Sequence, residues 1–211
     1  MKKLLIALMV LGMAAVSQAD VIANYTFAGS AATSSDTSAL STAGSFSISA
    51  GTWTYATSSS SSWAGQGGEI PVADRATWGT AATSFETQTT YWYFTVAVDA
   101  NYQLSITGLD FLGQRTVAGP ASFGWDVNGT LQESWTPGVT TVNSYSSAQT
   151  EGPLTGTVTI GIRGWSATST GNFRVDNVVL NGTITAIPEP GVLALLGLGL
   201  GALFYVRRNR K

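Results

Sequence analysis

Apolar and more polar side chains alternate with a period of two along the middle of this chain. The pattern is clearest over residues 93–98, 104–107 and 158–163. Such alternation places every second side chain on the same face of an extended strand, so each of these segments is predicted to be a half-buried β-strand. No stretch between the two ends keeps a 3.6-residue apolar period over ten positions, which argues against helices.

Further strands are predicted where β-branched and aromatic residues are bounded by Gly, Asn, Asp, Pro and Ser. They cover residues 21–27, 46–49, 52–55, 121–127 and 173–184. Eight or nine short strands without helices predict an all-β fold, an antiparallel β-sandwich in which each sheet hides one face against the other. The Ser/Thr/Ala-rich stretches 28–45 and 57–62 are predicted to be long loops.

Two local features refine this prediction. Residues 99–102, Asp-Ala-Asn-Tyr, separate two alternating runs and tolerate tight-turn geometry, so the flanking strands are predicted to form a hairpin. Within 173–184 the apolar phase slips by one residue at Asp176 and Asn177, which predicts a β-bulge there.

Composition excludes several function classes. Residues 20–187 contain eleven acidic and four basic side chains and no lysine, a net charge of −7, so nucleic-acid binding is disfavoured. The absence of cysteine excludes disulfides and thiol catalysis, and the absence of histidine removes the commonest metal ligand and general base. No motif pairs two carboxylates or supplies a phosphate cradle. We therefore expect that the protein is not an enzyme.

The C-terminal end carries a distinct signal. Pro188, Glu189 and Pro190 precede an uncharged apolar run over residues 191–206, and the chain ends in Arg-Arg-Asn-Arg-Lys. At helical rise the run spans about 24 Å, enough for a transmembrane helix with some adjustment by flanking groups. The basic cluster is predicted to stay in the cytoplasm, which places the rest of the chain on the opposite side.

Pro-Glu-Pro, apolar helix and Arg-rich tail together resemble the PEP-CTERM sorting signal. This resemblance covers residues 188–211 and implies an exported protein of a Gram-negative bacterium that makes extracellular polysaccharide, processed by exosortase, a membrane-embedded cysteine transpeptidase-like enzyme. It implies that Pro188, Glu189 and Pro190 are recognition residues and that the cluster containing Arg207, Arg208 and Arg210 fixes orientation. A plain tail anchor is the alternative interpretation.

The N-terminal end agrees with export. Lys2 and Lys3 precede an apolar stretch over residues 4–16, and small residues at Ser17 and Ala19 fit signal peptidase cleavage between Ala19 and Asp20. The alternative is an uncleaved anchor. The predicted organisation is a signal peptide at 1–19, a β-sandwich domain at 20–187 and a sorting signal at 188–211, with an inner-membrane intermediate before the cell surface or extracellular space.

A second resemblance concerns the predicted sandwich itself. Residues 93–183, including Asp-Ala-Asn-Tyr-Gln-Leu at 99–104 and Phe-Arg-Val-Asp-Asn-Val at 173–178, resemble jelly-roll modules of bacterial surface proteins. The resemblance implies a jelly-roll-like antiparallel β-sandwich. Such modules are related in architecture to carbohydrate-binding modules, so contact with a glycan is one implied role.

Tryptophans are the first candidates for such contact. The chain has seven of them. Trp63, Trp78 and Trp135 fall in predicted loops, where binding residues concentrate, and flat aromatic faces stack on sugar rings. Packing in the sandwich core is the alternative for each of them.

One group of residues suggests a metal site. Asp176 and Asn177, together with Asp99 or Asp110, supply oxygens that suit a structural Ca²⁺. A role in a turn or bulge is the simpler interpretation, because calcium needs six or more oxygen ligands. No other cofactor is expected.

Together these observations predict an exported, non-enzymatic protein that is a structural or adhesive partner of an extracellular polysaccharide. Its expected processing partners are signal peptidase and exosortase, and its contact with the inner membrane is expected to be transient. The alternative is a carbohydrate-binding surface module with a defined glycan ligand.

Overall fold

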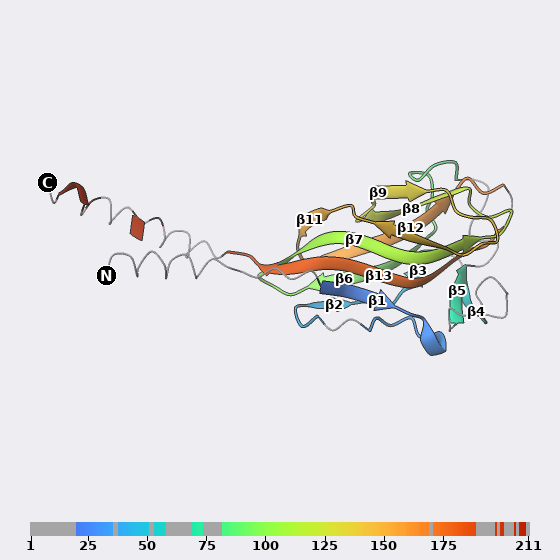
Figure 1. Ribbon diagram of the computed structural model, residues 1–211, viewed down its shortest axis with the longest axis horizontal. Helices are drawn as coiled ribbons and strands as arrows, with labels where there is room; N and C mark the ends of the chain where they lie inside the picture. The colour runs from blue at the N-terminus through green and yellow to red at the C-terminus, as the bar shows by residue number, and fades with distance from the viewer. Residues whose placement is uncertain are drawn as a thin grey trace.

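The computed structural model describes residues 20–35, 38–50, 53–57, 69–73, 82–168 and 171–188, with residues 197, 199–200, 205 and 207–209 of the C-terminal segment. Strands dominate these regions, and a single 3₁₀ turn, η1 (Ala28–Ser30), is the only helical element found between residues 20 and 188 in the ranges given. The strands form two sheets that stack face to face along the long axis of the domain (Figure 1).

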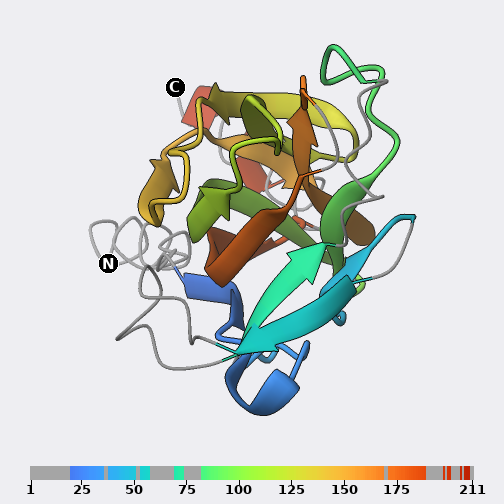
Figure 2. The ribbon, with the colours of Figure 1, turned by 90° about the vertical axis from the view of Figure 1, so that its right-hand side faces the viewer.

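One sheet has seven strands. Its main path runs β10 (Asn143–Ser147), β7 (Tyr102–Arg115), β13 (Phe173–Ala186), β5 (Glu69–Ala73) and β4 (Trp53–Thr57). In addition, β1 (Asp20–Tyr25) pairs with β13, and β11 (Glu151–Leu154) pairs with β7. Seen end-on, β4 and β5 lie in front of the other strands, at the end of the sandwich away from the start of β1 and the end of β13 (Figure 2).

The second sheet has six strands. Its path runs β2 (Ser41–Ala43), β6 (Tyr91–Val98), β12 (Thr157–Trp165), β8 (Ser122–Val127) and β9 (Thr130–Trp135), and β3 (Ser47–Ile48) also pairs with β6. The pairs between named strands in both sheets are antiparallel. The predicted fold class, a jelly-roll-like antiparallel β-sandwich, is confirmed.

The core lies between the sheets and follows the alternation seen in the sequence. Phe94 and Val96 of β6 and Ile160 of β12 are fully buried from one side, and Leu104 of β7 and Leu180 of β13 from the other. Removing these apolar faces from water is the main driving force for the stacking of the two sheets, since each sheet buries its apolar face against the other.

The predicted hairpin around residues 99–102 is wrong. The turn itself is tight, because the N–H of Tyr102 donates to the carbonyl of Asp99 at 3.1 Å and Asn101 adopts a positive φ of 70°. However, β6 belongs to the six-stranded sheet and β7 to the seven-stranded sheet. Two strands with one apolar face can bury it by facing each other across the core, and periodicity does not distinguish this arrangement from pairing side by side.

The predicted bulge in β13 is confirmed. Its register against β7 shifts between Asp176 and Val179, and Asn177 has a φ of 48°. The extra residue lets Val175 and Val178 both point into the core despite their odd and even numbers.

Several strands were not predicted. They are β2, β5, β9, β10 and β11, and the first of them lies inside the stretch expected to be a loop. These strands are short, and all five contain Ser, Thr, Pro or Gly, which weakens the apolar alternation by which a strand is recognised. Their backbones pair with neighbouring strands, so tertiary context defines them where local sequence does not.

The two ends of the domain lie together. β1 begins at Asp20 opposite Gly182, and β13 ends at Ala186 opposite Tyr102, so both chain ends leave the sandwich on the same side (Figure 1). Among the described residues no helix is both long enough and apolar enough to cross a membrane. The predicted signal peptide at 1–19 and most of the predicted transmembrane helix at 191–206 lie outside those residues.

Candidate functional site

The outer face of the six-stranded sheet brings together side chains from three neighbouring strands. Arg163 of β12 lies opposite Tyr91 of β6, and Gly161 of β12 lies between Tyr93 of β6 and Asp126 of β8. Alternate residues of these strands fill the core, so pleating directs this second set away from it. We call Tyr91, Tyr93, Asp126, Gly161 and Arg163 the outer cluster.

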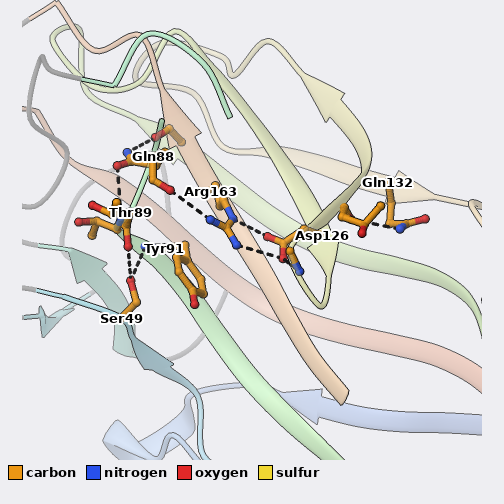
Figure 3. A network of polar contacts seen from close by, with 11 residues as sticks. Ser49, Gln88, Thr89, Tyr91, Asp126, Gln132 and Arg163 are labelled. Atoms are coloured by element: carbon orange, nitrogen blue, oxygen red, sulfur yellow. Dashed lines mark hydrogen bonds and ion pairs between the residues drawn. The ribbon is translucent and has the colours of Figure 1, made fainter. Parts of the chain in front are cut away.

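An ion pair connects two strands within the outer cluster. Nε of Arg163 donates to Oδ2 of Asp126 at 2.7 Å, and Nη2 donates to Oδ1 at 3.3 Å (Figure 3). The side chain of Asp126 is 1% exposed and that of Arg163 is 14% exposed. Two parallel hydrogen bonds in a shielded position form the strong, geometrically specific type of Arg–carboxylate pair. The backbone N–H of Gly129 adds a third donor to Oδ1, at 3.0 Å.

Gly161 provides the space for this carboxylate. A Cβ at residue 161 would overlap Oδ2 of Asp126. Every residue other than glycine at this position would therefore displace the carboxylate from its place beside Arg163. The geometry of the ion pair therefore depends on residue 161 having no side chain.

Arg163 also holds the segment that precedes β6. Its Nη1 donates to the carbonyl of Gln88 at 3.1 Å, and its guanidinium lies 4.0 Å from the ring centre of Tyr91 and 4.8 Å from that of Phe85. The side-chain amide of Gln88 in turn donates to the carbonyl of Gly164 (Figure 3). The cation is therefore enclosed by two aromatic rings, a carboxylate and a carbonyl, all of which favour positive charge.

The two tyrosines supply the partly exposed aromatic rings of the cluster. Tyr91 and Tyr93 are half-buried, with ring centres 5.8 Å apart. Ser49 fixes the backbone of this edge, because its Oγ accepts the N–H of Tyr91 at 2.9 Å and donates to the carbonyl of Thr89 at 2.9 Å (Figure 3). The arrangement offers flat aromatic surface beside hydroxyl groups, with its one cation already neutralised by Asp126.

The tryptophan candidates are distributed differently from the prediction. Trp63 and Trp78 lie outside the described residues. Trp135 does not lie in a loop, which corrects its predicted position: it ends β9, opposite Phe123, and its ring centre is 5.5 Å from that of Phe123. Its half-buried ring packs against the core because its strand faces inward there. Its contact with a glycan stays a prediction.

Asp176 and Asn177 lie in the bulge of β13. Asp176 is 2% exposed, and its Oδ1 accepts the N–H of Asn177 at 2.7 Å. Burial raises the pKa of Asp176 to about 6, and the hydrogen bond from Asn177 offsets only part of that effect. Over the described residues no three Asp, Glu, His or Cys side chains gather where they could hold a metal ion. The calcium interpretation therefore finds no further acidic ligands in that part of the chain.

The sorting residues begin directly after the folded domain. Pro188 is exposed two residues beyond β13, and the N–H of Ile187 donates to the carbonyl of Asn101 at 2.7 Å. Arg207 and Arg208 are exposed in helical backbone, and Asp20 is the exposed first residue of β1. Ala19, Glu189, Pro190 and Arg210 lie outside the described residues.

Sequence reasoning did not single out the outer cluster. A signal was present, since β12 is a strand of alternating apolar residues whose other positions include one glycine and one arginine. Arg163 follows the inward-facing Ile162 in this strand and is one of only four cations in residues 20–187. A charged residue in a half-buried strand indicates a polar or charged partner nearby. The identity of that partner, Asp126, depends on which strand pairs with β12, and no periodic pattern reports it.

Comparison with known families identifies the C-terminal segment. Residues 186–211 match the PEP-CTERM protein-sorting motif, which confirms the resemblance drawn from Pro-Glu-Pro and the basic tail. The chain thus carries the signal of an exported protein that is targeted to an exosortase and reaches the cell surface by way of a membrane-anchored intermediate.

Comparisons of the whole chain are more distant. Among solved structures, the chain is similar to the CBM36-1 domain of a multidomain xylanase from the hindgut metagenome of Trinervitermes trinervoides, with 9% sequence identity and a TM-score of 0.39 over 71% of this chain and 99% of that domain. No curated protein matches the chain.

Proposed function

We propose that this protein is a non-enzymatic component of the cell surface or extracellular matrix, where it acts as a structural or adhesive partner of polysaccharide. The observation that carries the proposal is the PEP-CTERM motif, which starts at the last residue of β13. Exosortase and signal peptidase would remove the two ends of the precursor, leaving a β-sandwich that begins near Asp20 and ends near Pro188.

The surface chemistry of the domain supports a polysaccharide partner. Residues 20–187 carry few charges and no lysine, and their polar groups are mostly the hydroxyls and amides of Ser, Thr, Asn and Gln. Such groups exchange hydrogen bonds with sugar hydroxyls as readily as with water. The net charge of −7 disfavours anionic partners such as nucleic acid.

The described tryptophans favour a structural role over a tryptophan-lined binding site. Trp92 and Trp125 are fully buried, and Trp135 packs inward against the core. Trp165 is half-buried on the outer face with its ring against Phe85. These four tryptophans therefore do not gather on one exposed face.

The intact mass of the protein recovered from its native host tests the processing step. We expect a chain that starts at Asp20 and ends between Pro188 and Gly191, and a Glu189→Ala variant that keeps its apolar tail. Glu151→Ala, which changes an acidic residue of β11, is the matched control and should be processed normally. If both the native protein and the Glu189→Ala variant retain residues 191–211, the tail is a simple membrane anchor.

Fractionation of the matrix tests the role after processing. We expect the processed protein to sediment with extracellular polysaccharide and to be released when that polysaccharide is digested. A deletion strain complemented by the gene should regain matrix cohesion only when export is intact. A processed protein that remains free in the medium, with no change in the matrix on deletion, would contradict the proposed role.

A further inference from the structure

We propose that the outer face of the six-stranded sheet binds a chain of neutral sugars, with Tyr91 and Tyr93 as the residues that stack on it. The inference rests on the proposed polysaccharide partner and names the surface and the chemical class. Three properties of the outer cluster carry it: partly exposed aromatic surface, the absence of a free charge and a fixed geometry.

Four aromatic rings and the guanidinium of Arg163 form a series of contacts across the sheet. The ring of Tyr93 contacts that of Tyr91, Arg163 lies between the rings of Tyr91 and Phe85, and Phe85 contacts Trp165 edge-to-face with ring centres 6.1 Å apart. Phe85 is buried, so the half-exposed members Tyr91, Tyr93 and Trp165 present the accessible rings. Flat, partly exposed rings on a rigid sheet are suited to the apolar faces of pyranose rings.

The charges on this face of the sheet favour neutral over anionic polysaccharides. The only charged side chains on β6, β8 and β12 are Asp126 and Arg163, and they neutralise each other. With no cation free on these strands and a net charge of −7 for the domain, a polyuronate or a sulfated glycan would be repelled. A neutral glycan meets no such penalty.

Hydroxyl groups surround the rings. Ser47 of β3 lies opposite Tyr93, and Thr95 of β6 lies opposite Thr159 of β12 on the same face. All three are half-buried, so their hydroxyls are accessible in part. They supply both donors and acceptors, which is the pattern that sugar hydroxyls require.

The rings are held before any ligand arrives. Arg163 is fixed by two hydrogen bonds to Asp126 and one to the carbonyl of Gln88, and it covers one face of Tyr91 at 4.0 Å. Binding would therefore order few side chains, which lowers its entropic cost. Because β6 is paired on both sides, this face offers side chains and no free backbone edge, which favours a glycan over an added peptide strand.

Native affinity electrophoresis of the processed protein tests the proposal. Dextran, hydroxyethyl cellulose and galactomannan serve as neutral probes, with alginate and polygalacturonate as anionic probes. We expect retardation by at least one neutral polymer and none by the anionic polymers. Tyr93→Ala should weaken it about five- to tenfold, the range of an aromatic stacking contact. Tyr93→Phe should retain it, and Thr185→Ala on the other sheet is the matched control.

Each result has a separate meaning. No retardation by any neutral probe, or unchanged retardation of Tyr93→Ala, overturns the assignment of this face. If Tyr93→Ala still sediments with the native matrix as the wild-type protein does, this face is not the contact and the proposed function stands. If the wild-type protein does not associate with the matrix at all, the proposed function fails as well. Circular dichroism and a thermal melt confirm that Tyr93→Ala is folded.

Discussion

The two sheets carry similar polar residues on their outer faces and use them differently. On the six-stranded sheet, Asp126 and Arg163 occupy neighbouring strands and form a bidentate ion pair. On the seven-stranded sheet, Asp176 and Arg174 lie two residues apart on β13, and Arg174 donates to Gln114 at 3.2 Å instead. In the described part of the chain, Asp176 forms no ion pair and receives only the N–H of Asn177.

The difference shows that equally buried carboxylates can have different partners. Asp126 and Asp176 are 1% and 2% exposed. Asp126 has a cation at 2.7 Å. Asp176 has none among the described residues, and burial raises its pKa to about 6. Burial likewise lowers the pKa of Arg174, whose Nε finds no acceptor among the described residues. Neighbouring strands let side chains converge, and residues i and i+2 of one strand point in parallel directions.

The largest expected effect is that of Arg163→Ala. The substitution leaves Asp126 buried without its cation and removes the contact that holds Gln88, so we expect a loss of about 3 kcal/mol in the free energy of unfolding. Urea denaturation of the processed protein measures it. Arg174→Ala is the matched control and should lose about 1 kcal/mol or less. Equal losses for the two variants would show that the ion pair contributes nothing specific.

Asp176→Asn is expected to stabilise the domain at neutral pH, the next largest effect. With a folded-state pKa of about 6 against an ordinary value of 3.8, the folded protein holds a proton that the unfolded chain releases. The contribution of Asp176 therefore falls as pH rises from about 4 to about 6, and the full penalty is present above that range.

Removing this charge should add about 2 kcal/mol at pH 7.5 and almost nothing at pH 4. Thermal melts of the variant and the wild-type protein at both pH values measure the difference. Asp126→Asn is the control of opposite sign, because it weakens a formed ion pair. An equal gain in stability for Asp176→Asn at both pH values would contradict the proposed titration of Asp176.

The contrast between the sheets marks the limit of what the sequence predicted. Alternation identified β6 and β12, the phase slip identified the bulge at Asp176, and the terminal motif identified the sorting signal. Each of these features is encoded in residues that are adjacent along the chain. The turn at 99–102 was recognised as a turn, but its flanking strands were assigned to one sheet instead of two.

Pairing between segments that are distant in the sequence explains why the remaining features were not predicted. Asp126 and Arg163 are 37 residues apart and meet only because β8 and β12 are neighbours. Likewise, Trp135 was expected in a loop because the Thr, Gln, Glu and Ser around it carry no clear strand signal, and its pairing with β8 makes it part of a sheet. Local propensity does not contain this information.

Gly161→Ala tests the space requirement of the ion pair. The new Cβ would overlap Oδ2 of Asp126, so the carboxylate must move away from Arg163. We expect a loss of about 2 kcal/mol by urea denaturation, within the range for an overpacked, well-ordered site. In an Asp126→Ala background the same substitution should cost less than about 0.5 kcal/mol, because the overlapping atom is gone. If Gly161→Ala costs the same stability in both backgrounds, the loss comes from the backbone at residue 161 and not from overlap with Asp126.

The smallest expected effect separates the two tyrosines of the outer cluster. The guanidinium of Arg163 lies 4.0 Å from the ring centre of Tyr91, and Tyr93 has no such contact among the described residues. Tyr91→Leu should therefore lose about 0.5–1 kcal/mol beyond the loss of Tyr93→Leu, since leucine retains apolar bulk and removes the cation–π attraction. The excess should disappear in an Arg163→Ala background, which urea denaturation of the four variants measures as a double-mutant cycle. If the excess persists without Arg163, the difference comes from packing against β12, and the cation contributes nothing to holding the ring. If it disappears, the ion pair that distinguishes this sheet from the other one also fixes the aromatic surface that we assign to sugar binding.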